Sequence, residues 1–295
     1  MNNPKFMQFC CHNQDSKLQS SFENHLNEFE VNGIFNPSFF VKDDLEVFSF
    51  RAIADKETSE PLSYISVKSR QGVHRANISK YLENELLDPR FIDPKIFTID
   101  NDIYITFNSG WCPGGNNIFV MKVFPNIERP KRVLYDNRQP QERNWAFFSR
   151  DGEIYALYWI NPLVILKLTE QTDATWKFVE WHNGDAQPDV DKDLTIGTQI
   201  NNSYFVGHGK LKRDKKKIYL GRLMSLDFDQ KKINQGKYSL SHSFESLLKC
   251  KPKHNENLFS CTYFSGLQVN SIKVTLSYGI NDTEYGFSTH EINDL

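Results

Sequence analysis

Short apolar stretches recur along the whole chain, and polar turn residues separate them. Several stretches alternate between apolar and polar positions, which is the pattern of a β-strand with one buried face. Turn-forming sequences such as Asp151-Gly152 and Asn183-Gly184 lie between them. The pattern predicts strands at residues 45–50, 64–67, 103–107, 118–123, 154–159, 164–168, 204–206, 218–223 and 272–278.

Two segments, residues 17–30 and 79–86, have helical spacing instead, and we expect them to be surface decorations. Aromatic residues make up 14% of the chain, and such side chains suit the half-buried surface of a sheet. Periodicity and composition together predict an all-β fold. The architecture could then be a sandwich, a barrel or a propeller.

A weak internal repeat favours the propeller. Similar units begin near Asn36, Asp88, Asn144, Gly197 and Phe259. The step between them, roughly fifty to sixty residues, is the length of one four-stranded blade. We therefore predict a five-bladed β-propeller with short helical decorations over residues 35–295. Residues 1–34 are predicted to be a partly helical extension that packs on the propeller.

The unit starts are rich in polar side chains, which are rarely buried without partners. Because the first strand of each blade lines the axis of a propeller, these side chains would converge on one wet axial pocket. Arginines there suit phosphate or carboxylate oxygens. Asp88 and Asp282 could accept sugar hydroxyls or move a proton, and Trp111, Trp145 and Trp159 offer flat faces for a sugar ring. A local salt bridge at Asp88 and a structural His208 remain alternatives.

Net charge and hydropathy limit the classes of binding partner and the cellular location that we expect. A formal net charge of −2 argues against a nucleic-acid binder. The N-terminus lacks the apolar core of a secretion signal, the apolar runs are too short to span a bilayer, and five scattered cysteines indicate free thiols. We expect a cytoplasmic protein. The basic cluster at residues 210–217 is either a solvated hairpin tip or a contact for phosphate or the inner face of the membrane.

Five short motifs, taken in order, resemble the β-mannoside phosphorylases of glycoside hydrolase family 130 and the related propeller mannosyltransferases. They span residues 35–292 and read Phe35-Asn36-Pro37-Ser38 with Arg51, Asp88-Pro89-Arg90, Arg143-Asn144-Trp145, Gly207-His208-Gly209 and Tyr278-Gly279-Ile280-Asn281-Asp282. The resemblance implies a five-bladed propeller with its active site at the axis.

The resemblance also assigns roles to residues. The predicted catalytic residues are Asp88, Asp282 and His208. The predicted substrate-binding residues are Asn36, Arg51, Arg90, Arg143, Asn144, Trp145 and Tyr278. Phosphate would be held by Arg143, His208 and Lys210. No cofactor or metal is expected, because the sequence has no ligand set for one.

One departure from the family pattern bears on the reaction. Where the phosphorylases carry a Lys-Asp pair whose aspartate protonates the glycosidic oxygen, this sequence reads Arg143-Asn144, and an amide cannot donate such a proton. The sequence therefore favours a glycosyltransferase that moves a mannose-like sugar from a nucleotide-sugar or sugar phosphate donor to a glycan acceptor, in polysaccharide biosynthesis. A glycoside phosphorylase or hydrolase acting on β-mannosides, and a non-catalytic glycan-binding propeller, are the alternatives.

Overall fold

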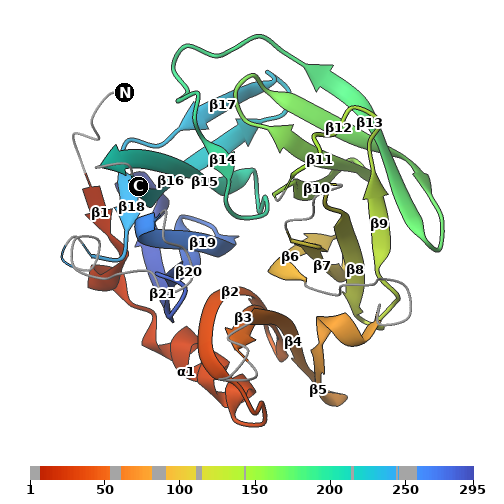
Figure 1. Cartoon of the computed structure of the whole chain (residues 1–295), viewed down its shortest axis with the longest axis vertical. Coiled ribbons are helices and arrows are strands. Elements are labelled where there is room, and N and C mark those ends of the chain that lie inside the picture. Colours follow the sequence, from red (N-terminus) through yellow and green to blue (C-terminus); the bar gives the residue numbers. More distant parts are fainter. Residues whose placement is uncertain are drawn as a thin grey trace.

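The structure, a computed structural model, describes residues 7–53, 61–81, 91–110, 115–142, 144–213, 216–243, 245 and 258–295. Nearly all of this part of the chain is β-structure. Its sheets are curled and stand around a common centre in a nearly closed, propeller-like ring (Figure 1). The predicted all-β class is confirmed.

The first sheet is a four-stranded antiparallel meander near the N-terminus. Its strands are β2 (Asn32–Lys42), β3 (Leu45–Ile53), β4 (Pro61–Ser69) and β5 (Gly72–Asn77). Short turns join β2 to β3 and β4 to β5, and Asp43 in the first turn has a φ of 52°. Aspartate tolerates this left-handed conformation better than most residues, which explains the tight reversal there.

The second sheet consists of two antiparallel meanders joined edge to edge. The first meander contains β6 (Ile92–Ile99), β7 (Asp102–Asn108), β8 (Ile118–Phe124) and β9 (Lys131–Leu134). The second contains β10 (Ala146–Arg150), β11 (Glu153–Trp159), β12 (Val164–Gln171) and β13 (Thr175–Asn183). The parallel pairing of β13 with β9 unites them into eight strands.

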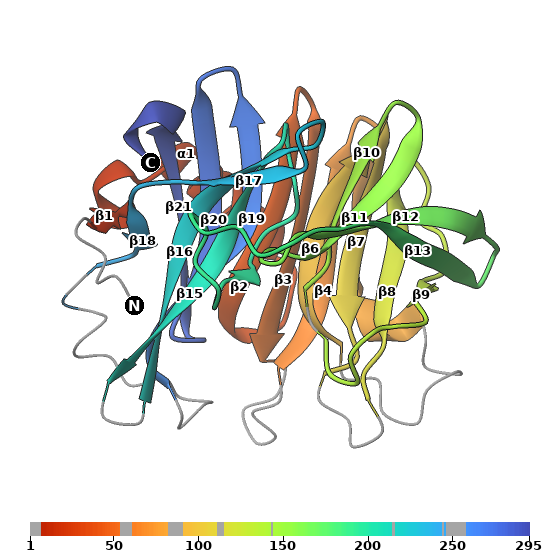
Figure 2. The ribbon, with the colours of Figure 1, turned by 90° about the horizontal axis from the view of Figure 1, so that it is seen from above.

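The third sheet contains the remaining strands. An antiparallel group is formed by β14 (Thr195–Ile196), β15 (Tyr204–Arg213), β16 (Lys216–Asp227) and β17 (Lys232–Gln235). A second group is formed by β19 (Leu258–Asn270), β20 (Lys273–Ile280) and β21 (Glu284–Glu291). The strands β1 (Met7–Phe9) and β18 (Ser239–Ser241) complete the sheet. The long β15–β16 hairpin projects at one end of the ring (Figure 2).

We call the groups β2–β5, β6–β9, β10–β13, β14–β17 and β19–β21 the five units. The first strand of each unit, namely β2, β6, β10, β14 or β19, faces the centre of the ring (Figure 1). These strands begin at or within a few residues of the unit starts predicted from the internal repeat. The predicted unit starts therefore coincide with the strands that face the centre of the ring.

Most local predictions are confirmed. Each of the nine predicted strand segments overlaps an observed strand. The predicted helix at residues 17–30 corresponds to α1 (Ser16–Leu26), which Asp15 caps by accepting a hydrogen bond from the Leu18 amide. The second predicted helix begins as a 3-10 turn, Ile78–Tyr81, and its remainder lies outside the described residues.

The helix α1 is held on the ring by an aromatic cluster. Phe22 is fully buried, and its ring lies 5.1 Å from that of Phe48 and 5.5 Å from that of Phe287. These two rings come from the first and last units. The helix therefore covers the junction at which the chain closes the ring. No helix among the described residues is long and apolar enough to cross a membrane.

Side chains connect the innermost parts of neighbouring units. The first strands β2, β6, β10 and β14 pair only within their own units, while β19 also pairs with β16 of the preceding unit. The amide of Gln199 donates to the Trp145 carbonyl and accepts from the Phe147 amide, both at 2.8 Å. Gln268 makes the same two-way contact with the N–H and C=O of Val41. Each bridge satisfies buried backbone groups that have no strand partner on that side.

We expect the replacement of Gln199 by alanine to lower the free energy of unfolding by about 2 to 4 kcal/mol, because it leaves a buried N–H and a buried C=O without a partner. Urea denaturation would measure this change. Gln230→Ala, at an exposed turn, is the matched control and should change the stability by less than about 0.5 kcal/mol. Equal stabilities for the two variants would contradict the bridging role.

Candidate active site

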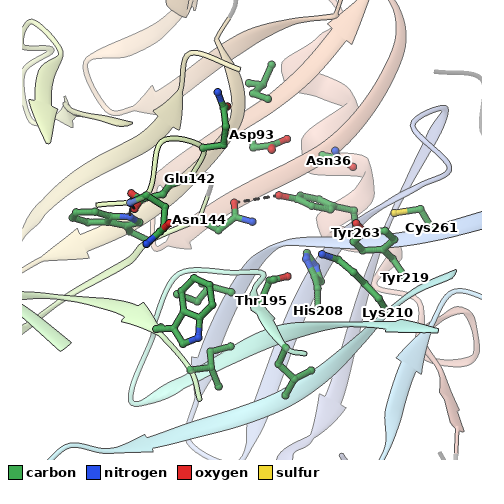
Figure 3. Close-up of a pocket in the computed structure, with 18 of the residues that line it drawn as sticks. Asn36, Asp93, Glu142, Asn144, Thr195, His208, Lys210, Tyr219, Cys261 and Tyr263 are labelled. Carbon is green, nitrogen blue, oxygen red and sulfur yellow. Dashed lines mark hydrogen bonds between the residues drawn. The ribbon is translucent and has the colours of Figure 1, made fainter. Parts of the chain in front are cut away.

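A cavity lies at the centre of the ring, between the starts of the first strands (Figure 3). Its volume is about 830 Å³, in the upper part of the range of pockets that enclose small ligands. Carboxylates, cations, amides and aromatic rings all contribute to its wall. Such a lining suits a ligand that carries both hydroxyl groups and negative charge.

Seven of the residues predicted from the sequence meet on the wall of this cavity. They are Asn36, Arg51, Asn144, Trp145, His208, Lys210 and Asp282. They come from distant parts of the chain, and only the ring arrangement of the units brings them together. Asp88, Arg90 and Arg143 lie outside the described residues, so their roles stay predictions.

Tyr278 is the predicted site residue that the structure places elsewhere. It is not part of the cavity wall, and its buried ring lies 5.5 Å from that of Phe264 in a hydrophobic core cluster. On the neighbouring strand, a Cβ at Gly286 would come within 2.7 Å of the Tyr278 ring. The ring therefore packs over a glycine in the core, and the geometry gives its predicted substrate-binding role no support.

Asp93 and Lys95 are functional candidates that the sequence reasoning missed. Asp93 lines the cavity with a φ of 55°, and its carboxylate lies 3.4 Å from the guanidinium of Arg51. The signal was present, because Asp93-Pro94-Lys95 repeats the pattern of Asp88-Pro89-Arg90 five residues later. The motif Asp93-Pro94-Lys95 lies at the start of β6, directly before the apolar part of that strand. Because the start of β6 faces the centre of the ring, the motif lies there too.

Lys95 and Tyr263 fix the orientation of the Asn144 amide. The Lys95 ammonium donates to Asn144 Oδ1 at 2.7 Å. The Tyr263 hydroxyl donates to the same oxygen at 3.4 Å (Figure 3). The ammonium also lies 5.2 Å from the centre of the Tyr263 ring, a cation–π contact. With its oxygen held by two donors, Asn144 offers its amide N–H groups to a ligand.

Lys95 is a buried cation, with a side chain only 1% exposed. Burial lowers its pKa to about 8, and the nearby negative charge of Asp93 opposes this shift only in part. Keeping the ammonium charged at neutral pH costs folding free energy on the order of 3 kcal/mol. A cost of this size beside a cavity is typical of a group that is kept for function.

His208 is held as a neutral ring. It is 1% exposed, and burial, together with the positive charges of Lys95 and Lys210, lowers its pKa well below the ordinary value. Its Nε2 atom accepts a hydrogen bond from the Phe264 amide at 2.9 Å, so the proton is on Nδ1. His208 can therefore donate a hydrogen bond, but the geometry does not favour the proton-transfer role predicted for it.

Glu142 lines the cavity, and the surrounding donors occupy both of its oxygens. Oε2 accepts from Trp145 Nε1 at 3.0 Å and lies 3.3 Å from the Arg138 guanidinium. Oε1 accepts from the Tyr158 hydroxyl at 2.5 Å and from the Gln139 amide. Glu142 therefore anchors the loop between β9 and β10, which carries Asn144 to the cavity.

The tryptophans predicted as stacking faces differ in position. Trp145 is 2% exposed and its indole N–H is bound to Glu142, so it mainly stabilises the loop. Trp159 also lines the cavity but is 45% exposed. Trp111 lies outside the described residues. Of the two described tryptophans at the cavity, only Trp159 therefore presents a large exposed face.

Asn36 occupies the cavity wall in a left-handed conformation, with a φ of 52°. Its Oδ1 atom is buried and has no hydrogen-bond partner among the described residues. Gly279 makes room for this amide, because a Cβ at Gly279 would lie 1.7 Å from Oδ1 and 2.9 Å from the Asn36 backbone nitrogen. Position 279 therefore requires glycine, because the backbone there packs directly on Asn36.

Two lysines of the basic cluster, Lys210 and Lys217, reach the cavity wall. The Lys210 ammonium lies 5.3 Å from the centre of the Tyr219 ring. The side chains at residues 212–216 lie outside the described part of the structure, so the membrane contact stays a prediction. Within the described residues, no group of three or more His, Cys, Asp or Glu side chains is placed to hold a metal ion.

No protein-family model matches the chain, and no curated protein matches its sequence. Solved structures do match. A structure from the GH130 family of mannoside phosphorylases, which contains glycoside hydrolases that target β-1,2 mannosidic linkages in Candida mannan, has 12% identity and a TM-score of 0.59. The match covers 89% of this chain and 85% of that one.

Two phosphorylases show the same likeness. The β-1,2-mannobiose phosphorylase from Listeria innocua has 14% identity and a TM-score of 0.55, with 91% of this chain and 92% of that one covered. MPT-4, a mannose phosphorylase from Leishmania mexicana solved with a phosphate ion, has 12% identity and a TM-score of 0.52, with 94% and 93% covered.

These likenesses confirm, at the level of the fold, the resemblance indicated by the short motifs. The matched structures named here are phosphorylases and hydrolases. At 12% to 14% identity, the likeness shows the fold that this chain shares with these structures.

We expect Gly279→Ala to destabilise the protein and to displace Asn36, since the added methyl group would overlap the Asn36 amide. A loss of about 1 to 3 kcal/mol should appear in urea denaturation. In Gly209→Ala the new Cβ meets only Leu194 Cδ2 at 3.5 Å, an ordinary contact, and this control should be tolerated. A loss in the control as large as that in Gly279→Ala would argue against the specific clash.

A second prediction concerns Lys95→Met. In the wild type, the unfolded chain binds more protons than the folded one between pH 8 and 10.5, so the contribution of Lys95 to stability rises through that window. The stability of the variant relative to the wild type should therefore fall, by up to about 3 kcal/mol, as the pH rises. Denaturation curves from pH 7 to 10 test this, with exposed Lys232→Met as control. A difference that does not change with pH would refute the cost assigned to Lys95.

Proposed function

We propose that the protein is a carbohydrate-active enzyme that cleaves mannosides by transferring the mannosyl unit to inorganic phosphate. The observation that carries this proposal is the cavity wall that Lys210 and Lys217 share with the carboxylates Asp93 and Asp282, with the buried Lys95 ammonium held behind it against Asn144. The fold shared with mannoside phosphorylases supports the same class of reaction. We also propose that the five units are the five blades of a propeller, with the active site at its axis.

Phosphate would occupy the cationic part of the wall. The side chains of Lys210 and Lys217 lie there, and the neutral ring of His208 can donate through Nδ1. Lys95 adds positive charge from below the Asn144 amide. Arg51 is already paired with Asp93, so it orients a carboxylate and contributes less to binding the anion.

The sugar to be transferred would lie beside the carboxylates. Burial raises the pKa of Cys261 well above its ordinary value, and the negative charges of Asp282 and Asp93 raise it further. Both carboxylates therefore act on the same part of the wall as this thiol. With the amides of Asn36 and Asn144, they offer acceptors and donors for the hydroxyl groups of a hexose.

In the proposed reaction a phosphate oxygen forms a bond to the anomeric carbon while the glycosidic C–O bond breaks. The products are mannose 1-phosphate and the released sugar, whose oxygen takes up a proton. Glu142 is unsuited to supply that proton, since both of its oxygens accept hydrogen bonds. Asp282 lines the cavity, and its negative charge acts on the Cys261 thiol of the same wall, so we assign the proton transfer to this carboxylate.

We expect the purified protein to convert β-1,2-mannobiose and phosphate into mannose and mannose 1-phosphate. Chromatography of the products, with and without phosphate, measures this. Release of mannose without phosphate would identify a hydrolase. Turnover only of a nucleotide-activated mannose would support the glycosyltransferase instead. The absence of any turnover would support a non-catalytic glycan-binding propeller.

Variants test the assigned roles. Asp282→Asn should lower kcat by about 100-fold or more, because an amide cannot transfer the proton. Lys210→Ala should mainly raise the KM for phosphate. Asp173→Asn, in an exposed turn, is the control and should leave both constants unchanged. If kcat for Asp282→Asn stays near that of the wild type, the assignment of Asp282 is wrong.

A further inference from the structure

Trp159 is an exposed indole at the mouth of the central cavity. Four large hydrophobic side chains are strongly exposed among the described residues, namely Val73, Trp159, Val179 and Ile272. Of these, only Trp159 lies on the cavity wall. Leaving a tryptophan open to water forgoes the stability that its burial would give, so its position at a ligand cavity calls for a functional explanation.

The local strand geometry turns Trp159 outward. The register of β11 against β12 shifts between Leu157 and Trp159, and Trp159 then pairs with Val164. Such a bulge re-aims side chains at the end of a strand. The preceding Tyr158 is fixed by its hydrogen bond to Glu142, and the following Ile160 is buried. The backbone of Trp159 is thus held on both sides, and its ring needs little ordering when a ligand binds.

The surroundings of Trp159 differ from the charged part of the cavity. Pro140 and Leu194 provide apolar surface there, while Gln139, Gln141 and Thr195 provide polar groups. A sugar ring has an apolar C–H face and a rim of hydroxyl groups, so it can stack on the indole and bond to polar groups at its edge. Apart from Glu142, the charged residues discussed above belong instead to β3, β6, β15, β16 and the turn between β20 and β21.

The size of the cavity leaves room for both regions to be occupied. Its volume of about 830 Å³ lies near the top of the range for pockets that enclose a whole drug-sized ligand. A phosphate ion and one hexose beside the carboxylates do not require so large a space. Trp159 lines the same cavity, so a further sugar could lie against it.

We propose that Trp159 is a specificity-determining residue, which stacks on a sugar of the leaving group and makes the enzyme select oligosaccharides by the part that is released. This inference rests on the proposed function. It specifies the substrate class as saccharides with at least one sugar on the leaving-group side. That sugar would bind between β11, the β9–β10 loop and the segment at Leu194 and Thr195.

The reverse reaction separates the two substrates. With mannose 1-phosphate as donor and mannobiose as acceptor, Trp159→Ala should raise the KM for the acceptor about tenfold and leave the KM for the donor unchanged. Trp159→Phe should recover most of the acceptor affinity, since it keeps an aromatic face. Val179→Ala, exposed but away from the cavity, is the control and should change neither constant. Equal acceptor constants in wild type and Trp159→Ala would overturn the inference.

Calorimetry distinguishes a failure of this inference from a failure of the proposed function. Binding of mannotriose to the full chain is measured without turnover, for the wild type and for Trp159→Ala. Weaker binding to the variant supports the stacking subsite even if no phosphorolysis occurs. Unchanged binding overturns it, even if the wild type forms mannose 1-phosphate. Thermal unfolding at the same temperature in both proteins would show that the exposed substitution leaves the fold intact.

Discussion

The structure depends on polar side chains that bridge the first strands of neighbouring units. The strands β2, β6, β10 and β14 each pair with only one strand, inside their own unit, so their other edges need partners for the N–H and C=O groups, whereas β19 also pairs with β16 of the preceding unit. Ser38 accepts from the Ile96 amide, Gln199 holds Trp145 and Phe147, and Gln268 holds Val41. These bonds satisfy buried backbone groups and set the spacing of the ring.

The same spacing produces the cavity. Because side chains separate the first strands, the starts of these strands remain apart, and the polar residues located there face a common space. Lys95 takes part both in the side-chain bridges between units and in the polar surroundings of the cavity. Its ammonium bridges β6 to the loop before β10 through Asn144, and it also adds positive charge to the cavity. One contact therefore links the closure of the ring to the electrostatics of the site, at a cost in stability that burial of the charge explains.

The residues around the cavity fall into two chemical groups. Asp93, Lys95 and Asp282, with their neighbours, supply charges and fixed amides that suit a phosphate and a reacting sugar. On the side of β11, Glu142 anchors Tyr158, and the adjacent Trp159 presents an aromatic face. A cavity of this kind can hold an anion and a chain of sugars in neighbouring positions, which is what phosphorolysis of an oligosaccharide requires.

The sequence alone determined the all-β class, the repeat of the units and much of the cavity lining, because strand periodicity and the position of polar residues at unit starts are local properties. The tertiary structure decided the rest. It placed Asp93 on the cavity wall with the buried Lys95 behind it, and it buried Tyr278 over Gly286. Similar local patterns acquire different surroundings when strands distant in sequence pack together. Which side of a strand faces the axis, and which donors meet at one oxygen, are therefore fixed only by the closed ring.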